Sequence, residues 1–274
     1  MIPKKNEIKL VALDLDGTVM CSQGKSPVSE RTKMAVAALL QAGIPVTFVT
    51  GRTEDYAMPL AREFGLQAPL VTYNGARIYC PKESRVLHES TIDPLQAASI
   101  ADWLKTDDEI VACYLTRDGR LHLYQSRCSG NPAHDDYLFG TPRTIVESLS
   151  GEIRVPKSTV SKLIVSTQRP LESEVPERFG PVAHVVRTHP ELLEILPMGV
   201  SKGQGVVRLL QMLAIDPVNV VAVGDQDNDI STFEVCGFSA AMGDAPDHVK
   251  LAATMITGTF EEDGCAQILE KLLA

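Results

Sequence analysis

Two aspartates, Asp14 and Asp16, directly follow an apolar run and precede Gly17. A carboxylate at the end of a buried strand can act as a nucleophile, and a second carboxyl group two residues on can pass a proton to a leaving group. Gly17 lets the chain turn sharply at this place. The pair therefore suggests phosphoryl transfer, in which Asp14 can attack and Asp16 can give a proton to the leaving group.

Residues suited to binding phosphate and a cation follow later in the chain. The Thr50 hydroxyl and the Gly51 amide can donate hydrogen bonds to a phosphate group. Lys202, at the start of a helix, can place a positive charge on the phosphate oxygens. Carboxylates repel a phosphate dianion unless a cation neutralises them, and Mg²⁺ prefers such hard oxygen ligands. Asp225 is the expected third protein contribution to a magnesium site.

The elements that would position these residues are the strands of a parallel sheet. Apolar runs without helical period predict buried strands, and segments with N-cap and glycine stop signals between them predict helices. The predicted strands cover 8–13, 44–49, 69–72 and 218–223, and the predicted helices cover 29–43, 53–65 and 201–213. Ligands bind beyond the carboxyl ends of strands in open α/β sheets, so the polar residues should meet at one rim.

The pattern changes between residues 83 and 189. A helix is expected at Asp93, and two alternating runs over 110–116 and 121–125 are joined through Asp118 and Gly119, a hairpin signal. Further strands are expected over 160–165 and 182–186, with a polar segment between them that could be helical. The predicted fold is an α/β protein with a Rossmann-like parallel-sheet core, formed by 1–82 and 190–274, and an inserted α+β cap over 83–189.

Composition narrows the class of partner. The 274 residues are 44% hydrophobic and 22% charged, as in ordinary globular proteins, and the formal net charge of −9 opposes extended contact with nucleic acid or an anionic membrane. The six cysteines include no C-x-x-C pair, which favours reduced thiols over a zinc or redox site. No run has the length of a membrane-spanning helix, and the N-terminal residues do not form a signal peptide, so we expect a cytoplasmic protein.

Each motif taken alone also has an ordinary structural interpretation. The residues from Asp14 to Gly17 could form a helix entry, Thr50 could be a capping residue, Lys202 could be solvated, and the acidic residues over 224–229 could form a polar loop. Their order and their shared position after predicted strands favour a common site instead.

Taken together, these residues resemble the Cof-type branch of the haloacid dehalogenase superfamily, whose members carry a type IIB cap. The matching segments are 14–18 (Asp-Leu-Asp-Gly-Thr), 50–52 (Thr-Gly-Arg), 201–203 (Ser-Lys-Gly) and 224–229 (Gly-Asp-Gln-Asp-Asn-Asp), with a further family-like segment at 72–76. The resemblance covers nearly the whole of the predicted core, whereas the middle region matches only in its place and its α/β character.

The resemblance implies a role for each motif residue. Asp14 is implied as the nucleophile and Asp16 as the acid/base, with Mg²⁺ held by Asp14, the Asp16 backbone carbonyl and Asp225. The implied phosphate-binding residues are Leu15, Thr50, Gly51, Lys202 and Asn228, and Asp229 is implied to support the metal or Lys202 from behind.

The implied activity is a magnesium-dependent phosphatase for small phosphorylated metabolites such as sugar phosphates, working through an aspartyl-phosphate. Two alternatives stay open at this point. One is a phosphomutase, or a phosphatase of the sucrose-phosphate or mannosyl-phosphoglycerate kind, on the same fold. The other is a binding protein without catalytic activity, which the intact Asp14, Asp16, Lys202 and Asp225 disfavour. The sequence predicts neither the oligomeric state nor the physiological substrate.

Overall fold

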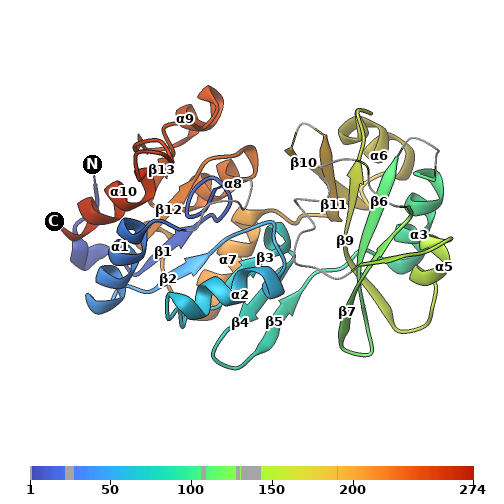
Figure 1. Ribbon diagram of the computed structural model, residues 1–274, viewed down its shortest axis with the longest axis horizontal. Coiled ribbons are helices and arrows are strands. Elements are labelled where there is room, and N and C mark those ends of the chain that lie inside the picture. The colour runs from blue at the N-terminus through green and yellow to red at the C-terminus, as the bar shows by residue number, and fades with distance from the viewer. Residues whose placement is uncertain (1, 22–27, 106–108, 128–129, 131–142, 190) are drawn as a thin grey trace. The chain divides into compact units, whose positions relative to one another are not determined.

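The computed structural model describes residues 2–21, 28–105, 109–127, 130, 143–189 and 191–274. The chain divides into two compact units (Figure 1). Unit 1 consists of Met1–His88 and Ser201–Ala274, and unit 2 consists of Glu89–Val200. The chain thus leaves unit 1 once and returns to it.

Unit 1 is built on a five-stranded sheet with the order β14-β13-β12-β1-β2. All of its pairings are parallel, which confirms the predicted parallel sheet. Its strands are β1 (Leu10–Leu13), β2 (Val46–Phe48), β12 (Val220–Gly224), β13 (Phe238–Ala241) and β14 (Met255–Ile256). Strand β1 lies between β2 and β12, so the segment after β1 is flanked by the segments after both neighbours.

The predicted strand over 69–72 belongs to a second, smaller sheet. This sheet consists of β3 (Leu70–Thr72), β4 (Arg77–Cys80) and β5 (Arg85–Glu89), and β3 pairs with β4 in antiparallel fashion. A parallel bridge between Val49 and Val71 joins it to the end of β2. The turn after β3 is therefore brought beside the segment that follows β2.

Helices cover both faces of the parallel sheet, as apolar residues on alternate sides of β1 require. Val11 and Leu13 pack with residues of α1 and α10, and Leu10 and Ala12 pack with residues of α7. Ser29, Thr53 and Ser201 accept hydrogen bonds from backbone amides at the starts of α1, α2 and α7, as N-cap residues do. The helices of unit 1 are α1 (Glu30–Gln41), α2 (Glu54–Glu63), α7 (Lys202–Leu213), α8 (Asp227–Val235), α9 (Asp247–Ala252) and α10 (Gly264–Leu273).

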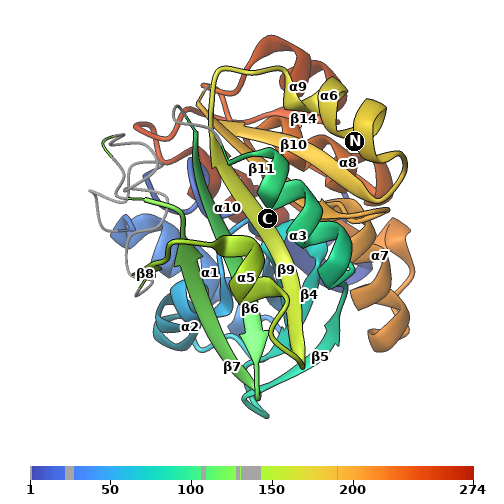
Figure 2. The ribbon, with the colours of Figure 1, turned by 90° about the vertical axis from the view of Figure 1, so that its right-hand side faces the viewer.

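Unit 2 is a six-stranded sheet with the order β10-β11-β9-β6-β7-β8. The predicted hairpin is confirmed, because Asp118 and Gly119 both have positive φ at the turn between β6 and β7. One face of the sheet packs on α3 (Pro94–Trp103), α5 (Leu149–Ile153) and α6 (Leu171–Phe179) (Figure 2). The strands are β6 (Ile110–Arg117), β7 (Arg120–Gln125), β8 (Arg143–Ile145), β9 (Ser158–Ser166), β10 (Ala183–His189) and β11 (Leu192–Pro197).

The end of unit 2 differs from the predicted division at residue 189. The sequence division placed residues 190–274 in the parallel-sheet core and predicted no strand over 192–197. Strand β11, at these residues, pairs with β9 and β10 in the sheet of unit 2, and this unit extends to Val200. A short buried apolar strand can join either sheet, and only its partners decide which. At the other boundary, the chain enters unit 2 at Glu89 rather than at residue 83.

Two further sequence expectations concern the whole chain. In the described ranges, no helix combines the length and the apolar character needed to cross a bilayer. Five cysteines lie in these ranges, and none of the five forms a disulfide. Cys128 lies outside the described residues.

Candidate active site

Asp14 is the first residue after β1, and its carboxylate is buried. Its Oδ1 accepts a hydrogen bond from Lys202 Nζ at 2.6 Å. The same ammonium donates to Asp229 Oδ1 at 2.7 Å, and only 2% of the Lys202 side chain is exposed. Lys202 opens α7 and Asp229 lies in the first turn of α8. One buried lysine therefore joins the ends of two helices to the carboxylate that follows β1.

Asp225 follows β12 and lies close to the turn after β1. Its Oδ1 accepts a hydrogen bond from the Thr18 hydroxyl at 3.0 Å, and its Oδ2 accepts one from Gln226 Nε2 at 2.9 Å. Gly17 has a φ of +88°, and a Cβ atom at this position would lie 2.2 Å from Asp225 Oδ2. Gly17 is therefore required both by its backbone conformation and by the approach of this carboxylate.

The carboxylates of Asp14, Asp225 and Asp229 form a buried cluster, with one oxygen of each within 4.8 Å of the others. Burial, strengthened by these neighbouring acids, raises the pKa of Asp14 well above its ordinary range, although Lys202 opposes the shift. Burial and the Asp229 carboxylate raise the pKa of Asp225 to about 7. Burial lowers the pKa of Lys202, but Asp14 and Asp229 outweigh that effect and raise it overall.

The charge of this cluster suits a divalent cation. When all three carboxylates are ionised, they and the one ammonium group leave two negative charges in a buried place, and all the ligand atoms of the cluster are hard oxygens. Mg²⁺ favours such oxygen ligands and keeps several waters of its own. The residues present therefore fit the expected ion.

The carboxylate of Asp16 is held apart from this cluster by Arg52. Arg52 Nε donates to Asp16 Oδ2 at 2.9 Å, and a terminal nitrogen of the same guanidinium donates to Oδ1 at 2.8 Å. The guanidinium also lies over the Tyr56 ring, 4.4 Å from its centroid. This bidentate pair is the strong form of an arginine–carboxylate contact. The Thr-Gly-Arg motif was noted in the sequence, but no role was predicted for Arg52.

Thr50 and Gly51 follow β2, so they lie beside the residues that follow β1. Thr50 is buried, its amide donates to the carbonyl of Val71, and its hydroxyl accepts a hydrogen bond from the Arg52 amide at 3.1 Å. Leu15 lies between the two aspartates, with its side chain in the core. The predicted strand-end residues are thus brought to one edge of the sheet.

Asn228 lies in the first turn of α8, next to Asp229. Its Nδ2 donates to Asn74 Oδ1 at 2.9 Å. Asn74 lies in the short turn after β3 and was not predicted as a site residue, although its segment was noted as family-like. The two asparagines lie 154 positions apart, so no local sequence pattern could have indicated their contact.

Comparisons with known proteins identify the family of this chain. A family model described as haloacid dehalogenase-like hydrolase matches residues 11–269. The chain belongs to this family. "Phosphatase YwpJ" of Bacillus subtilis (strain 168) is 30% identical to this hydrolase over 97% of its chain and 100% of the relative.

Two further similarities concern phosphatases. "5-amino-6-(5-phospho-D-ribitylamino)uracil phosphatase YwtE" of the same bacterium is 26% identical over 97% of this chain and 99% of the relative. A solved sugar phosphatase of HAD subclass IIB has the same fold, with a TM-score of 0.82 over 96% of this chain and 98% of that chain, at 20% identity. Family and relatives together identify this haloacid dehalogenase-like hydrolase as a phosphatase.

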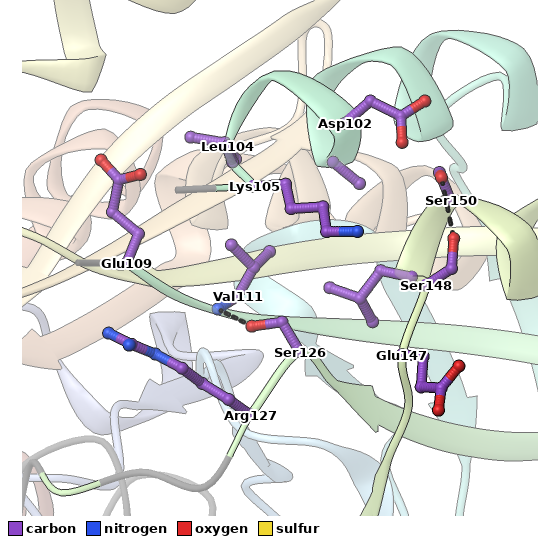
Figure 3. A pocket seen from close by; sticks show the side chains of 12 residues that line it. Asp102, Leu104, Lys105, Glu109, Val111, Ser126, Arg127, Glu147, Ser148 and Ser150 are labelled. Atoms are coloured by element: carbon purple, nitrogen blue, oxygen red, sulfur yellow. Dashed lines mark hydrogen bonds between the residues drawn. The ribbon is translucent and has the colours of Figure 1, made fainter. Parts of the chain in front are cut away.

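Unit 2 of the hydrolase contains a hollow of about 240 Å³ (Figure 3). Two contacts are drawn in its wall: the Ser126 hydroxyl accepts a hydrogen bond from the Val111 amide at 3.1 Å, and the hydroxyls of Ser148 and Ser150 lie 3.2 Å apart. Its lining includes Lys105 and Glu109 but none of the predicted site residues. The hollow is therefore separate from the carboxylate cluster of unit 1.

Proposed function

We propose that this phosphatase hydrolyses small phosphorylated metabolites, depends on Mg²⁺ and forms an aspartyl-phosphate on Asp14. The observation that carries the proposal is the buried contact of Asp14 with Lys202 inside a cluster of three carboxylates. Lys202 would draw a phosphate oxygen towards Asp14. Asp229 would orient Lys202 by accepting a hydrogen bond from its ammonium group.

The proposed magnesium ligands are Asp14, Asp225 and the backbone carbonyl of Asp16. Asp229 belongs to the same carboxylate cluster, and its second oxygen accepts hydrogen bonds from the amides of Asp225 and Gln226 at 3.0 Å. These bonds favour a supporting role for Asp229. When bound, Mg²⁺ would neutralise the carboxylates and stabilise the charge on the transferred phosphoryl group.

The proposed reaction has two steps. In the first, an Asp14 oxygen attacks phosphorus, the bond from phosphorus to the leaving oxygen breaks, and Asp16 gives that oxygen its proton. In the second, Asp16 takes a proton from water, the water oxygen attacks phosphorus, and phosphate leaves as the Asp14 carboxylate is restored. Both Asp16 oxygens accept hydrogen bonds from Arg52, which orients the carboxylate, and each oxygen keeps a second lone pair for proton transfer.

The proposed phosphate contacts are the Leu15 amide, the Thr50 hydroxyl, the Gly51 amide, Lys202 and Asn228. Sugar phosphates and related phosphomonoesters are the proposed substrates, and the names of the sugar phosphatase and of the ribitylamino-uracil phosphatase support this class. We assign substrate selection to unit 2 as the cap, since the core motifs all lie in unit 1. The acidic net charge supports a small-molecule partner in the cytoplasm over nucleic acid or a membrane surface.

A rapid-quench experiment with a ³²P-labelled phosphomonoester tests the mechanism. The wild type should accumulate acid-stable label on the protein, and Asp14→Asn should show none while still binding substrate. Asp16→Asn should slow turnover by about a hundred- to ten-thousand-fold, and by less with a good leaving group. Label on Asp14→Asn at the wild-type level, or full turnover in excess chelator, would refute the proposal.

A further inference from the structure

A left-handed turn follows β3 in unit 1. Tyr73, Asn74 and Gly75 have φ values of +52°, +53° and +97°. This region is costly for residues with a Cβ atom, by about 1–2 kcal/mol each, and such strain concentrates at functional sites. Asparagine is one of the few residues other than glycine that adopts the conformation readily. The turn is therefore a place where backbone conformation and side-chain identity are both constrained.

The backbone of this turn is fixed to the segment after β2. The Tyr73 amide donates to the carbonyl of Arg52, and the Asn74 amide donates to the carbonyl of Thr50, both at 3.0 Å. The Asn74 side chain is 1% exposed. The turn is thus hydrogen-bonded to the segment 50–52, which includes the proposed phosphate-binding residues Thr50 and Gly51.

The same turn supports the start of α7. A Cβ atom on Gly75 would lie 2.0 Å from the carbonyl oxygen of Ser201, the N-cap of the helix that begins with Lys202. Backbone therefore packs directly on backbone at this point, where no other residue fits. The position of the turn is held from two sides, independently of its contact with α8.

From this fixed turn, the Asn74 side chain contacts α8, which carries the proposed phosphate-binding residue Asn228. Its Oδ1 accepts one hydrogen from Asn228 Nδ2 at 2.9 Å. Asn228 Oδ1 is buried and has no hydrogen-bond partner among the described residues. An amide can turn over and exchange its oxygen and nitrogen, and an oxygen turned towards a phosphate would repel it. With Asn74 Oδ1 as the acceptor, the contact turns Asn228 Nδ2 towards Asn74 and leaves the second hydrogen of Nδ2 for a ligand.

We propose that Asn74 is a positioning residue that orients the phosphate-binding amide of Asn228. The proposal rests on the proposed function, because that function supplies the phosphate contact of Asn228. Asn74 acts here through Asn228 and does not itself touch the substrate. Its identity follows from two demands that few residues meet together, a positive φ and a side-chain acceptor.

The variant Asn74→Gly separates these two demands. Glycine accepts the left-handed conformation but removes the acceptor, so the turn and the thermal stability should be kept. The matched control is Ser84→Gly, which replaces an exposed residue with a φ of +51° in the turn between β4 and β5. Circular dichroism melts of both variants show whether folding is preserved.

The decisive measurement is the affinity of the Mg²⁺-loaded protein for inorganic phosphate, by calorimetry. Asn228→Ala should weaken binding by about tenfold or more, as expected for a lost hydrogen bond to a charged group. Asn74→Gly should weaken it by a similar factor, whereas Ser84→Gly should not. In the double variant, Asn74→Gly should add less than about twofold to Asn228→Ala, because two residues that act through one contact are not additive.

The outcomes distinguish this inference from the proposed function. Unchanged phosphate affinity in Asn74→Gly, together with weakened affinity in Asn228→Ala, would overturn the inference alone. Fully additive losses would also overturn it, because Asn74 would then act by another route. Unchanged phosphate affinity in Asn228→Ala would contradict the proposed phosphate contact of Asn228, and the inference about Asn74 would fall with it.

Discussion

Burial and neighbouring charges shift the pKa values of Asp14, Lys202 and Asp225 at the site. Burial and the Asp229 carboxylate raise the pKa of Asp225 to about 7, from about 3.9 in an unfolded chain. Between about pH 3.9 and about pH 7, Asp225 is therefore protonated in the folded metal-free protein but ionised in the unfolded chain. As pH rises through this window, Asp225 makes the metal-free protein less stable. A bound cation would stabilise the ionised Asp225 carboxylate and so offset this loss of folding stability.

Magnesium affinity should accordingly depend on pH. At pH 6, a proton occupies Asp225 and must be displaced by the ion, whereas at pH 8 the carboxylate is already ionised. We expect Mg²⁺ to bind about tenfold more weakly at pH 6 than at pH 8, measured by calorimetry. Asp118→Asn, in the hairpin of unit 2, is the control and should keep this dependence. Equal affinities at the two pH values would contradict the role of Asp225.

The pair of Arg52 and Asp16 gives a second prediction. Arg52→Met removes the guanidinium that orients the Asp16 carboxylate, and Arg52→Lys keeps the charge without the bidentate geometry. Both variants should lower kcat/KM for an alkyl phosphate by about ten- to a hundredfold, within the contribution of acid/base assistance. The loss should be smaller for p-nitrophenyl phosphate, which needs little protonation of its leaving group.

The control for this prediction is Arg62→Met, an exposed arginine near the end of α2. Its kinetics should match those of the wild type. Equal losses for both substrates in Arg52→Met would show that Arg52 acts on binding rather than on Asp16.

At the scale of elements, unit 2 contains a fully buried ion pair between two strands. Lys162 of β9 donates to Glu194 of β11 at 3.1 Å, and both side chains are 0% exposed. The ammonium also lies 4.9 Å from the centroid of the Tyr114 ring. Leu163 and Val165 belong to the apolar cluster beneath the helices, so Lys162 occupies the opposite face of the sheet.

Breaking this pair should destabilise the protein strongly. Lys162→Met removes a cation that pairs with the buried Glu194 carboxylate, at an expected cost of about 3–5 kcal/mol in the free energy of unfolding. The double variant Lys162→Met/Glu194→Leu removes both charges and should be clearly less destabilised than the single variant. Urea unfolding of the three proteins measures the difference. A single variant as stable as the double one would contradict this account.

The sequence predicted the elements that carry the site better than the contacts within it. Apolar runs ending in polar residues placed Asp14, Thr50 and Asp225 after parallel strands, because burial and strand ends leave a local pattern. The contact of Arg52 with Asp16 and that of Asn74 with Asn228 join separate segments, and no local pattern encodes them. The predicted boundary fell before β11 for a similar reason, since no local pattern in these residues shows which sheet they join.

At the scale of the whole molecule, the two units have separate apolar cores. The proposed magnesium site belongs to unit 1 alone, and a ligand stabilises the part of a protein that must stay folded to bind it. Mg²⁺ alone should therefore slow hydrogen exchange of amides within 10–88 and 201–273, measured by mass spectrometry. Amides of 109–127 and 143–189 should be unaffected. Equal protection in both units would show that they open together.

The position of β1 in the middle of its sheet has a consequence for biosynthesis. Its partner β2 follows soon after it, but its other partner, β12, pairs Val220 with Leu10. Unit 2 lies between them as one continuous stretch and can complete its own sheet first. On the ribosome, one edge of β1 therefore stays without its partner strand until the last quarter of the chain emerges. During that interval the nascent chain presents an open strand edge, the kind of surface that chaperones protect from aggregation.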